Sequence, residues 1–155
     1  MRRRRAEKRE LLPDPKYNSV LVSKFINMIM LRGKRSIAEK IVYRCFDRIG
    51  KETQKEPLEI FSAAIENARP LLEVKPRRIG GATYQVPIDV RQSRGVTMAM
   101  MWIRNFAKNR KNKPMEERLT EEILECFNKQ GSVIKKREDT HKMAESNKAF
   151  AHFRW

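Results

Sequence analysis

One stretch of this 155-residue chain has the period of a β-strand and only one candidate partner strand. From Tyr84 to Val90, apolar side chains alternate with polar ones and a proline, as they do in a half-buried strand. Leu72 and Val74 start an opposing strand, and Gly80-Gly81 tolerate the positive φ angles of a tight turn. We therefore expect one β-hairpin over about residues 72–91.

This hairpin does not suit the interior of a larger sheet. Pro76 and Pro87 lie inside its strands, and proline has no N–H group to donate to a neighbouring strand. Because an isolated two-stranded hairpin is at best marginally stable in water, the rest of the chain must steady it at its base. Arginines flank it on both sides, so it would present positive charge.

The remaining sequence is typical of short amphipathic helices, with apolar residues three and four positions apart. We expect Gly33 to end the first helix, Ser36 to cap the second and Gly50 to end it. Pro114 opens the fifth helix and Ser132 caps the sixth. The predicted fold is mainly α: a six-helix domain with one protruding β-hairpin between helices 3 and 4 and a basic N-terminal arm.

The chain divides into three parts. Residues 1–16 form an extended basic arm, because the prolines of Leu11–Pro15 favour an extended segment. Residues 17–149 form a single helical domain, and residues 150–155 form a C-terminal tail. The apolar run Val20–Leu31 is interrupted by Lys24 and Asn27 and is too short to span a bilayer. We expect an intracellular protein with no membrane partner.

Positive charge is in large excess. The chain carries 35 lysines and arginines against 19 aspartates and glutamates, a net charge of +16. A compact fold must overcome the repulsion among these charges, and a polyanion such as nucleic acid relieves it. The cations cluster where the chain bends or projects: on the arm, at Arg32–Arg35, along the hairpin, at Lys108–Lys113 and at Lys135–Arg137. Acidic residues concentrate in the third and fifth helices, which predicts one positive face and a milder back.

The sequence offers little for catalysis. Neither His141 nor His152 has a Cys, Asp or Glu partner at metal-ligand spacing, and Gly33-Lys34 lacks the upstream glycine of a phosphate loop. Cys45 and Cys126 lie in apolar helical stretches and are typical of core residues in a reducing compartment. We predict no enzymatic activity, no metal and no cofactor.

Three classes of function are compatible with a basic helical body and a basic ribbon. These elements fit irregular folded RNA better than a regular duplex, so a structural RNA-binding protein is the first hypothesis. An architectural protein that reads a groove of double-stranded DNA with its ribbon is the alternative. An RNA-modifying enzyme ranks last, because neither a cofactor site nor a metal site is visible.

Five segments resemble the bacterial or organellar ribosomal protein seven of the small subunit, a universal family. They are Pro13–Tyr17, Gly33–Ala38, Arg77–Pro87, Lys136–Glu145 and Asn147–Trp155, and the likeness runs along the whole chain. The resemblance implies the six-helix fold with a protruding hairpin and a structural role in the small ribosomal subunit during translation. It also implies a primary binder of the 3′ major domain of the small-subunit ribosomal RNA, which nucleates assembly of the head.

The resemblance further implies partners and sites. Members of the family lie at the subunit interface, near the exit-site tRNA and the mRNA path, and contact small-subunit ribosomal proteins nine and eleven. The residues implied to bind ribosomal RNA are Arg2, Arg3, Arg4, Arg5, Arg9, Lys34, Arg35, Lys75, Arg77, Arg78, Arg91, Arg94, Lys108, Arg110, Lys111 and Lys113. The residues implied to lie near the exit-site tRNA and mRNA are Gly80, Gly81, Ala82, Thr83, Tyr84, Lys142 and Lys148.

At two places the chain departs from the family pattern. The family often has a basic residue just before the tryptophan of the fourth helix and an arginine pair ahead of that helix, where this chain has Met101 and Arg94-Gly95. Met101 is therefore not among the predicted sites. The implied location is the ribosome, in the cytoplasm or, for an organellar source, in the stroma or matrix, and the sequence leaves both sources open.

Overall fold

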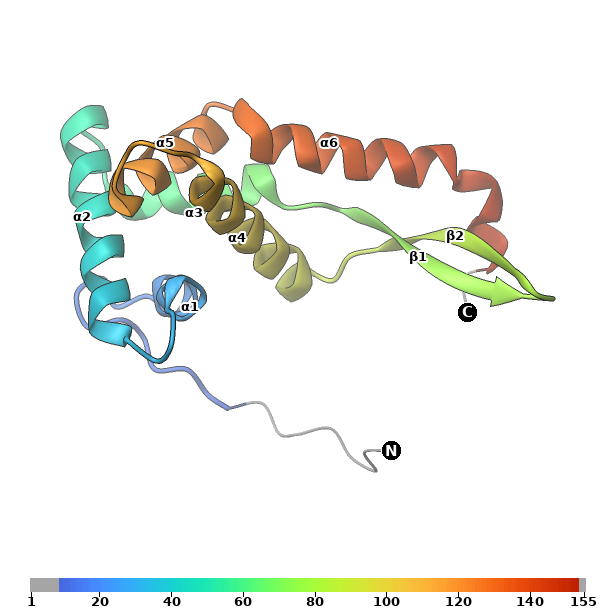
Figure 1. Cartoon of the computed structure of the whole chain (residues 1–155), viewed down its shortest axis with the longest axis horizontal. Helices are drawn as coiled ribbons and strands as arrows, with labels where there is room; N and C mark the ends of the chain where they lie inside the picture. The colour runs from blue at the N-terminus through green and yellow to red at the C-terminus, as the bar shows by residue number, and fades with distance from the viewer. Residues whose placement is uncertain (1–8, 154–155) are drawn as a thin grey trace.

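The computed structural model describes residues 9–153, which form seven helices and one hairpin. The elements are α1 (Val20–Ile29), α2 (Arg35–Thr53), α3 (Pro57–Ala68), β1 (Leu72–Ile79), β2 (Ala82–Asp89), α4 (Gln92–Asn109), α5 (Met115–Phe127), α6 (Gly131–Ser146) and the 3-10 helix η1 (Lys148–Phe153). Helices α1 to α5 gather at one end, and the hairpin projects away from them with α6 running beside it (Figure 1). The predicted fold, mainly helical with one hairpin between α3 and α4, is confirmed.

The centre of the core is aromatic. The ring centroids of Phe25 and Phe61 are 5.0 Å apart, and those of Phe46 and Phe61 are 5.1 Å apart. All three side chains are fully buried, one each from α1, α2 and α3. Burying an apolar side chain of this size contributes roughly 1.5–3 kcal/mol, so these rings join the first three helices. Cys45 and Cys126 are buried free thiols.

The serines predicted to cap helices lie inside first turns. Helix α2 begins one residue before Ser36, and α6 begins one residue before Ser132. In both cases the helix begins before the serine, because a glycine in the left-handed region turns the chain into it. This glycine is Gly33 (φ 75°) ahead of α2 and Gly131 (φ 87°) at the start of α6. Gly33 is also not the end of α1, which stops at Ile29.

Gly50 does not end α2. The helix continues to Thr53, and the residue that caps it, Gln54, takes the left-handed conformation (φ 53°). Gly50 is the point where α2 passes the start of α3, because a Cβ atom at residue 50 would lie 3.3 Å from Pro57 Cγ. The glycine therefore serves close packing. The predicted opening of α5 at Pro114 is confirmed.

The hairpin closes through Gly80-Gly81, whose φ angles are 56° and 91°. Ile79 pairs with Ala82, which gives a two-residue turn. Because ladder hydrogen bonds alternate along an antiparallel pair, counting from this turn puts Pro76 and Pro87 at positions where an N–H would point outward. The prolines leave the ladder intact and remove donors from both open edges, where a foreign strand could otherwise pair.

The root of the hairpin is fixed by two polar contacts. The backbone N–H of Leu71 donates to His141 Nε2 in α6 at 3.0 Å. Arg94, in the first turn of α4, donates from Nε and Nη2 to the carboxylate of Glu73 at 2.8–3.0 Å. The strands are therefore attached to helices on both sides of the root, as the expectation of a braced base requires.

The hairpin is also held beyond its base, which the sequence did not predict. The ring centroid of Tyr84 on β2 lies 5.3 Å from those of both Phe150 and Phe153 on η1. The chain after α6 thus forms a 3-10 helix that packs on the hairpin through these rings.

A buried carboxylate anchors the segment that leads into α1. Asp14 is fully buried, and its Oδ2 accepts the backbone N–H groups of Lys16 and Tyr17, each at 3.1 Å. Its Oδ1 accepts the hydroxyl of Tyr43 in α2 at 2.7 Å, and burial together with this hydrogen bond raises the pKa of Tyr43. Asp14 therefore locks the chain onto α2 and fixes the point where the arm leaves the body.

We expect Asp14→Ala to lower the free energy of unfolding by about 2–4 kcal/mol, because hydrogen bonds to a charged acceptor contribute roughly 1.5–3 kcal/mol and three part-buried donors would lose their acceptor. Denaturant unfolding followed by circular dichroism measures the loss. Asp47→Ala is the matched control: Asp47 is exposed and accepts from Lys16 Nζ at 3.0 Å, a kind of pair that contributes about 0–1 kcal/mol. Equal losses in the two variants would contradict the anchor.

The contact at the hairpin root should depend on pH. Burial, with repulsion from Arg137, lowers the pKa of His141 below its ordinary value of 6.5. His141 therefore takes up a proton more readily in the unfolded chain than in the folded chain. The stability that its contact with Leu71 contributes is present above the ordinary pKa of histidine and is lost as the pH falls through the folded-state pKa of His141. We expect the wild type to lose more thermal stability than His141→Gln between about pH 7 and about pH 5. Parallel losses would rule the contribution out.

Candidate nucleic-acid interface

The cations predicted to bind ribosomal RNA fall into two groups, because some are already paired with carboxylates of this chain. A guanidinium or ammonium group held by a glutamate has fewer donors left for a phosphate. Within residues 9–153, ion pairs are formed by Arg35, Lys75, Arg94, Arg110 and Lys113. The paired group therefore includes members of three of the predicted basic clusters.

Arg110 is the most strongly held cation. Directly after α4, its guanidinium donates to Glu122 Oε1 at 2.6 Å and Glu121 Oε2 at 2.8 Å, and it lies 2.6 Å from Glu125 Oε2. Burial opposes its charge, but hydrogen bonds with Glu125 and Glu122 raise the pKa of Arg110 above its ordinary value. Burial raises the pKa of Glu122, which is only 2% exposed, and Arg110 opposes that rise. Arg110 thus ties the loop after α4 to α5.

Glu73 has the same function at the hairpin. It is 6% exposed, accepts the two-pronged contact from Arg94 described above and lies 3.6 Å from Lys75 Nζ. The hydrogen bond with Glu73 raises the pKa of Arg94. The Arg94 side chain is still 56% exposed, so its outer edge remains open to a phosphate.

The second group consists of those predicted site residues that are exposed cations with no ion pair among residues 9–153. They are Arg9, Lys34, Arg78, Arg91, Lys108, Lys111, Lys142 and Lys148. They occupy the arm, the turn before α2, the hairpin and its exit, the end of α4 and the loop after it, and the α6–η1 side. Charge in this group is spread along an extended surface and does not converge on one pocket.

Charges are matched where α2 meets α5. Arg48 Nη2 lies 2.8 Å from Glu117 Oε1, and Arg44 Nη1 lies 3.4 Å from Glu116 Oε1. The glutamates belong to the first turn of α5, where the helix dipole also favours them. Arginines and glutamates therefore balance one another at this contact, and Lys51 beside it is exposed without an ion pair among residues 9–153.

The residues predicted to lie near the exit-site tRNA and mRNA belong to the hairpin turn and to the α6–η1 side. Gly80, Gly81, Ala82 and Thr83 are exposed at the turn of the hairpin, whereas Tyr84 is half-buried against η1. Lys142 is exposed on α6 and Lys148 at the start of η1. All of these residues except Tyr84 are therefore exposed.

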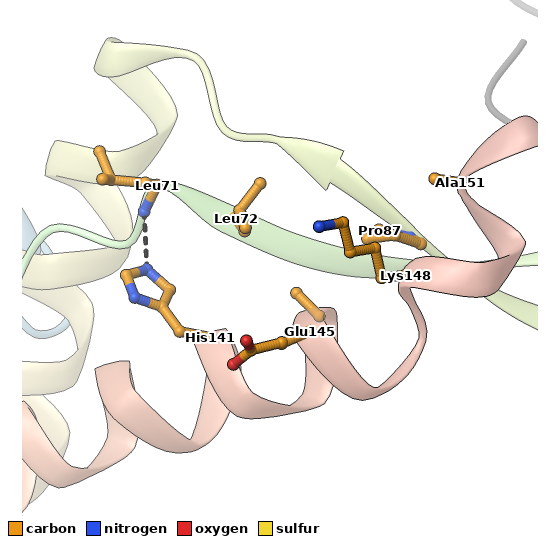
Figure 2. A pocket seen from close by; sticks show the side chains of 8 residues that line it. Leu71, Leu72, Pro87, His141, Glu145, Lys148 and Ala151 are labelled. Carbon is orange, nitrogen blue, oxygen red and sulfur yellow. Dashed lines mark hydrogen bonds between the residues drawn. The ribbon is translucent and has the colours of Figure 1, made fainter.

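A pocket of about 420 Å³ lies between the hairpin root and α6 (Figure 2). Its lining is mostly apolar and includes Leu72, Pro87 and Ala144, with Lys148 and Glu145 at one side. His141 is directed across one end to the backbone of Leu71. Since its Nε2 is occupied by this hydrogen bond, the ring acts as a structural acceptor here.

The described residues contain neither a metal-binding group nor an activated thiol. Among residues 9–153 no group of three or more histidine, cysteine, aspartate or glutamate side chains could hold a metal ion. Burial raises the pKa of Cys45 and of Cys126 to about 12, so neither thiol is activated as a nucleophile. None of the helices in the described part of the chain is long and apolar enough to cross a membrane.

Arg137 belongs to the basic cluster Lys135–Arg137 of the sequence, but its side chain makes a contact inside the fold. Its guanidinium donates to the backbone carbonyl of Asn67 at the end of α3. Asn67 in turn donates from Nδ2 to the carbonyls of Cys126 and Phe127 at 3.1 Å each. Arg137 therefore joins α3, α5 and α6, and no local signal separates it from its two lysine neighbours.

Arg2 to Arg5 lie outside the described residues, so their predicted contacts with ribosomal RNA stay predictions. Arg77 is half-buried on β1, and Arg35 is bound to Glu39 at 2.8 Å while its side chain stays 44% exposed. The described candidate interface therefore consists of the eight unpaired cations together with the outer edges of Arg35 and Arg94.

A family model and several curated relatives match the chain along its length. Residues 1–148 match the family model described as ribosomal protein S7p/S5e. The chain is 57% identical over 155 residues to the small ribosomal subunit protein uS7 of Thermotoga maritima, covering 100% of both chains. It is 57% identical to the uS7 protein of Fervidobacterium nodosum, again over 100% of both, and 58% identical to that of Thermodesulfovibrio yellowstonii over 99% of both. Because the match extends over both chains at this identity, the protein belongs to the ribosomal protein S7p/S5e family.

Proposed function

We propose that this chain is a structural, non-enzymatic constituent of the small ribosomal subunit and binds small-subunit ribosomal RNA during translation. The full-length identity to bacterial uS7 proteins supports this function. So does the arrangement of the unpaired cations, which suits a large folded polyanion better than a small ligand. Each phosphate that a lysine or arginine neutralises releases condensed counterions, which supplies affinity without a pocket.

We further propose a specific place in the subunit. The chain would be a primary binder of the 3′ major domain and nucleate assembly of the head, next to ribosomal proteins nine and eleven. Its hairpin turn would lie near the exit-site tRNA and the mRNA, in the cytoplasm for a bacterial source or in the stroma or matrix for an organellar one. The resemblance of the five segments quoted above supports this placement, and the exposed, glycine-rich turn allows backbone to approach ribose and phosphate closely.

The observation that carries the proposal is the division of the cations. A chain that used its basic residues only for folding would pair most of them with acidic residues. Here Lys108 and Lys111 lie on either side of the paired Arg110 and stay exposed without an ion pair within residues 9–153. Adjacent positions of one basic run therefore have different functions, one internal and two external.

This division predicts opposite effects for neighbouring substitutions. We expect Lys108→Gln/Lys111→Gln to weaken binding to a fragment of the 3′ major domain and to reduce the slope of log K against log salt by up to roughly one unit for each lost phosphate contact. Thermal stability should stay within about 0.5 kcal/mol of the wild type, because surface substitutions rarely cost more. Filter binding over a salt series and thermal unfolding measure the two quantities.

Arg110→Gln is the matched variant. It strands Glu122 in the interior, and breaking a buried ion pair typically costs about 3–5 kcal/mol, so it should destabilise the fold. A variant Arg110→Gln that keeps its stability while the salt slope falls, or a lysine pair with an unchanged slope, would contradict the division.

The identity of the polyanion is tested directly. We expect the protein to bind the folded ribosomal RNA fragment more tightly than duplex DNA at matched salt, because its cations follow an irregular surface. It should also remain with small ribosomal subunits during sedimentation after a high-salt wash. Equal affinity for duplex DNA, with loss from the subunits, would favour the architectural DNA-binding alternative.

A further inference from the structure

Three aromatic rings join the C-terminal 3-10 helix to the hairpin. We call Tyr84, Phe150 and Phe153 the aromatic clasp. The two phenylalanine rings are tilted by 52° and 41° from the ring of Tyr84, with both centroids 5.3 Å from it. Rings at this distance and tilt attract one another beyond the effect of the area they bury.

The aromatic clasp is separate from the core of the helical body. None of its rings belongs to the cluster of buried apolar residues, and all three are half-buried. The packing contacts of η1 are made with β2 and with the end of α6. The clasp therefore has little to contribute to the stability of α1 to α5.

Among the ring contacts within residues 9–153, those made by the hairpin are the two of Tyr84. His141 and Arg94 act at Leu71 and Glu73, at the very start of β1. Tyr84 pairs with Arg77 across the ladder, close to the turn. Because a two-stranded ribbon is marginally stable and flexible on its own, contacts at the root alone would leave its outer half free to bend.

We propose that η1 is a positioning element, in which Phe150 and Phe153 hold Tyr84 and thereby fix the direction in which the hairpin presents its basic side chains. This inference rests on the proposed RNA-binding function. A ribbon already held in one direction loses less conformational freedom on binding than one that swings about its root, so the clasp raises affinity by preorganisation. The clasp residues act through the hairpin and make no phosphate contact of their own.

The first test concerns the free protein. We expect Phe150→Ala/Phe153→Ala to speed hydrogen exchange in peptides covering β1 and β2 by about tenfold, because each lost ring pair changes an opening equilibrium by roughly 2- to 12-fold. Peptides from α2 and α3 should exchange as in the wild type. Tyr84→Ala should have the same effect, and adding it to the phenylalanine pair should change nothing further, since the contact is already lost.

Two variants separate the rings from a general effect of substitution. Phe150→Tyr/Phe153→Tyr keeps the rings and should restore slow exchange. Met143→Ala removes an apolar side chain that is 47% exposed on α6 and should leave the hairpin unchanged. Unchanged exchange in the alanine pair would overturn the clasp, and equal acceleration in α2 and α3 would reduce it to an ordinary stabilising contact.

The second test measures binding to the fragment of the 3′ major domain. The alanine pair should bind about threefold to tenfold more weakly, as expected for lost preorganisation, with the same dependence on salt as the wild type, because no phosphate contact is removed. Faster hairpin exchange with unchanged affinity would overturn the positioning role, and a reduced salt slope would mean that η1 binds RNA directly. Failure of the wild type to bind the RNA would overturn the proposed function, whereas the exchange comparison would still decide whether η1 holds the hairpin.

Discussion

Burial of a carboxylate at the root of the arm, of the hairpin and of the loop after α4 is the interaction on which the structure depends. The acidic residues buried among residues 9–153 are Asp14, Glu73 and Glu122. The first lies where the arm joins the body, the second where the hairpin starts, and the third beneath the loop that carries Lys111. A buried carboxylate left without partners is very costly, so each one enforces a single local geometry on the segment it holds.

This arrangement also answers the problem of net charge. A compact chain with a charge of +16 repels itself, and spreading carboxylates evenly over the surface would weaken both the repulsion and the attraction for a polyanion. Here glutamates of α5 form ion pairs with arginines of neighbouring segments, as they do with Arg110 and Arg48. Lys108 and Lys111 beside these roots form no ion pair within residues 9–153 and stay exposed to a polyanion.

Local signals in the sequence were enough to predict the six α-helices and the hairpin, but not η1 or the contacts between these elements. The alternation in residues 84–90 and the glycine pair at the turn predicted the hairpin, since two-residue turns with positive φ admit few other residues. Gly50 was wrongly predicted to end a helix. The structural reason for a glycine there is close contact with Pro57 of another helix, which the local sequence does not show. Arg110 and Lys111 look alike in the sequence, and their different functions depend on glutamates of α5 that approach only after folding.

The contacts of η1 were hidden for a similar reason. Tyr84 is far from Phe150 and Phe153 in the chain, and helices α4 and α5 and the largely polar α6 separate the hairpin from its C-terminal partner. Helix α6 is polar because much of its length lies beside the hairpin and not inside the core (Figure 1). It acts as a strut: its first turns are buried through Val133 and Ile134, His141 holds the hairpin root, and η1 reaches the ribbon near its turn. A marginal hairpin can therefore project from a helical body because a helix of similar length projects with it.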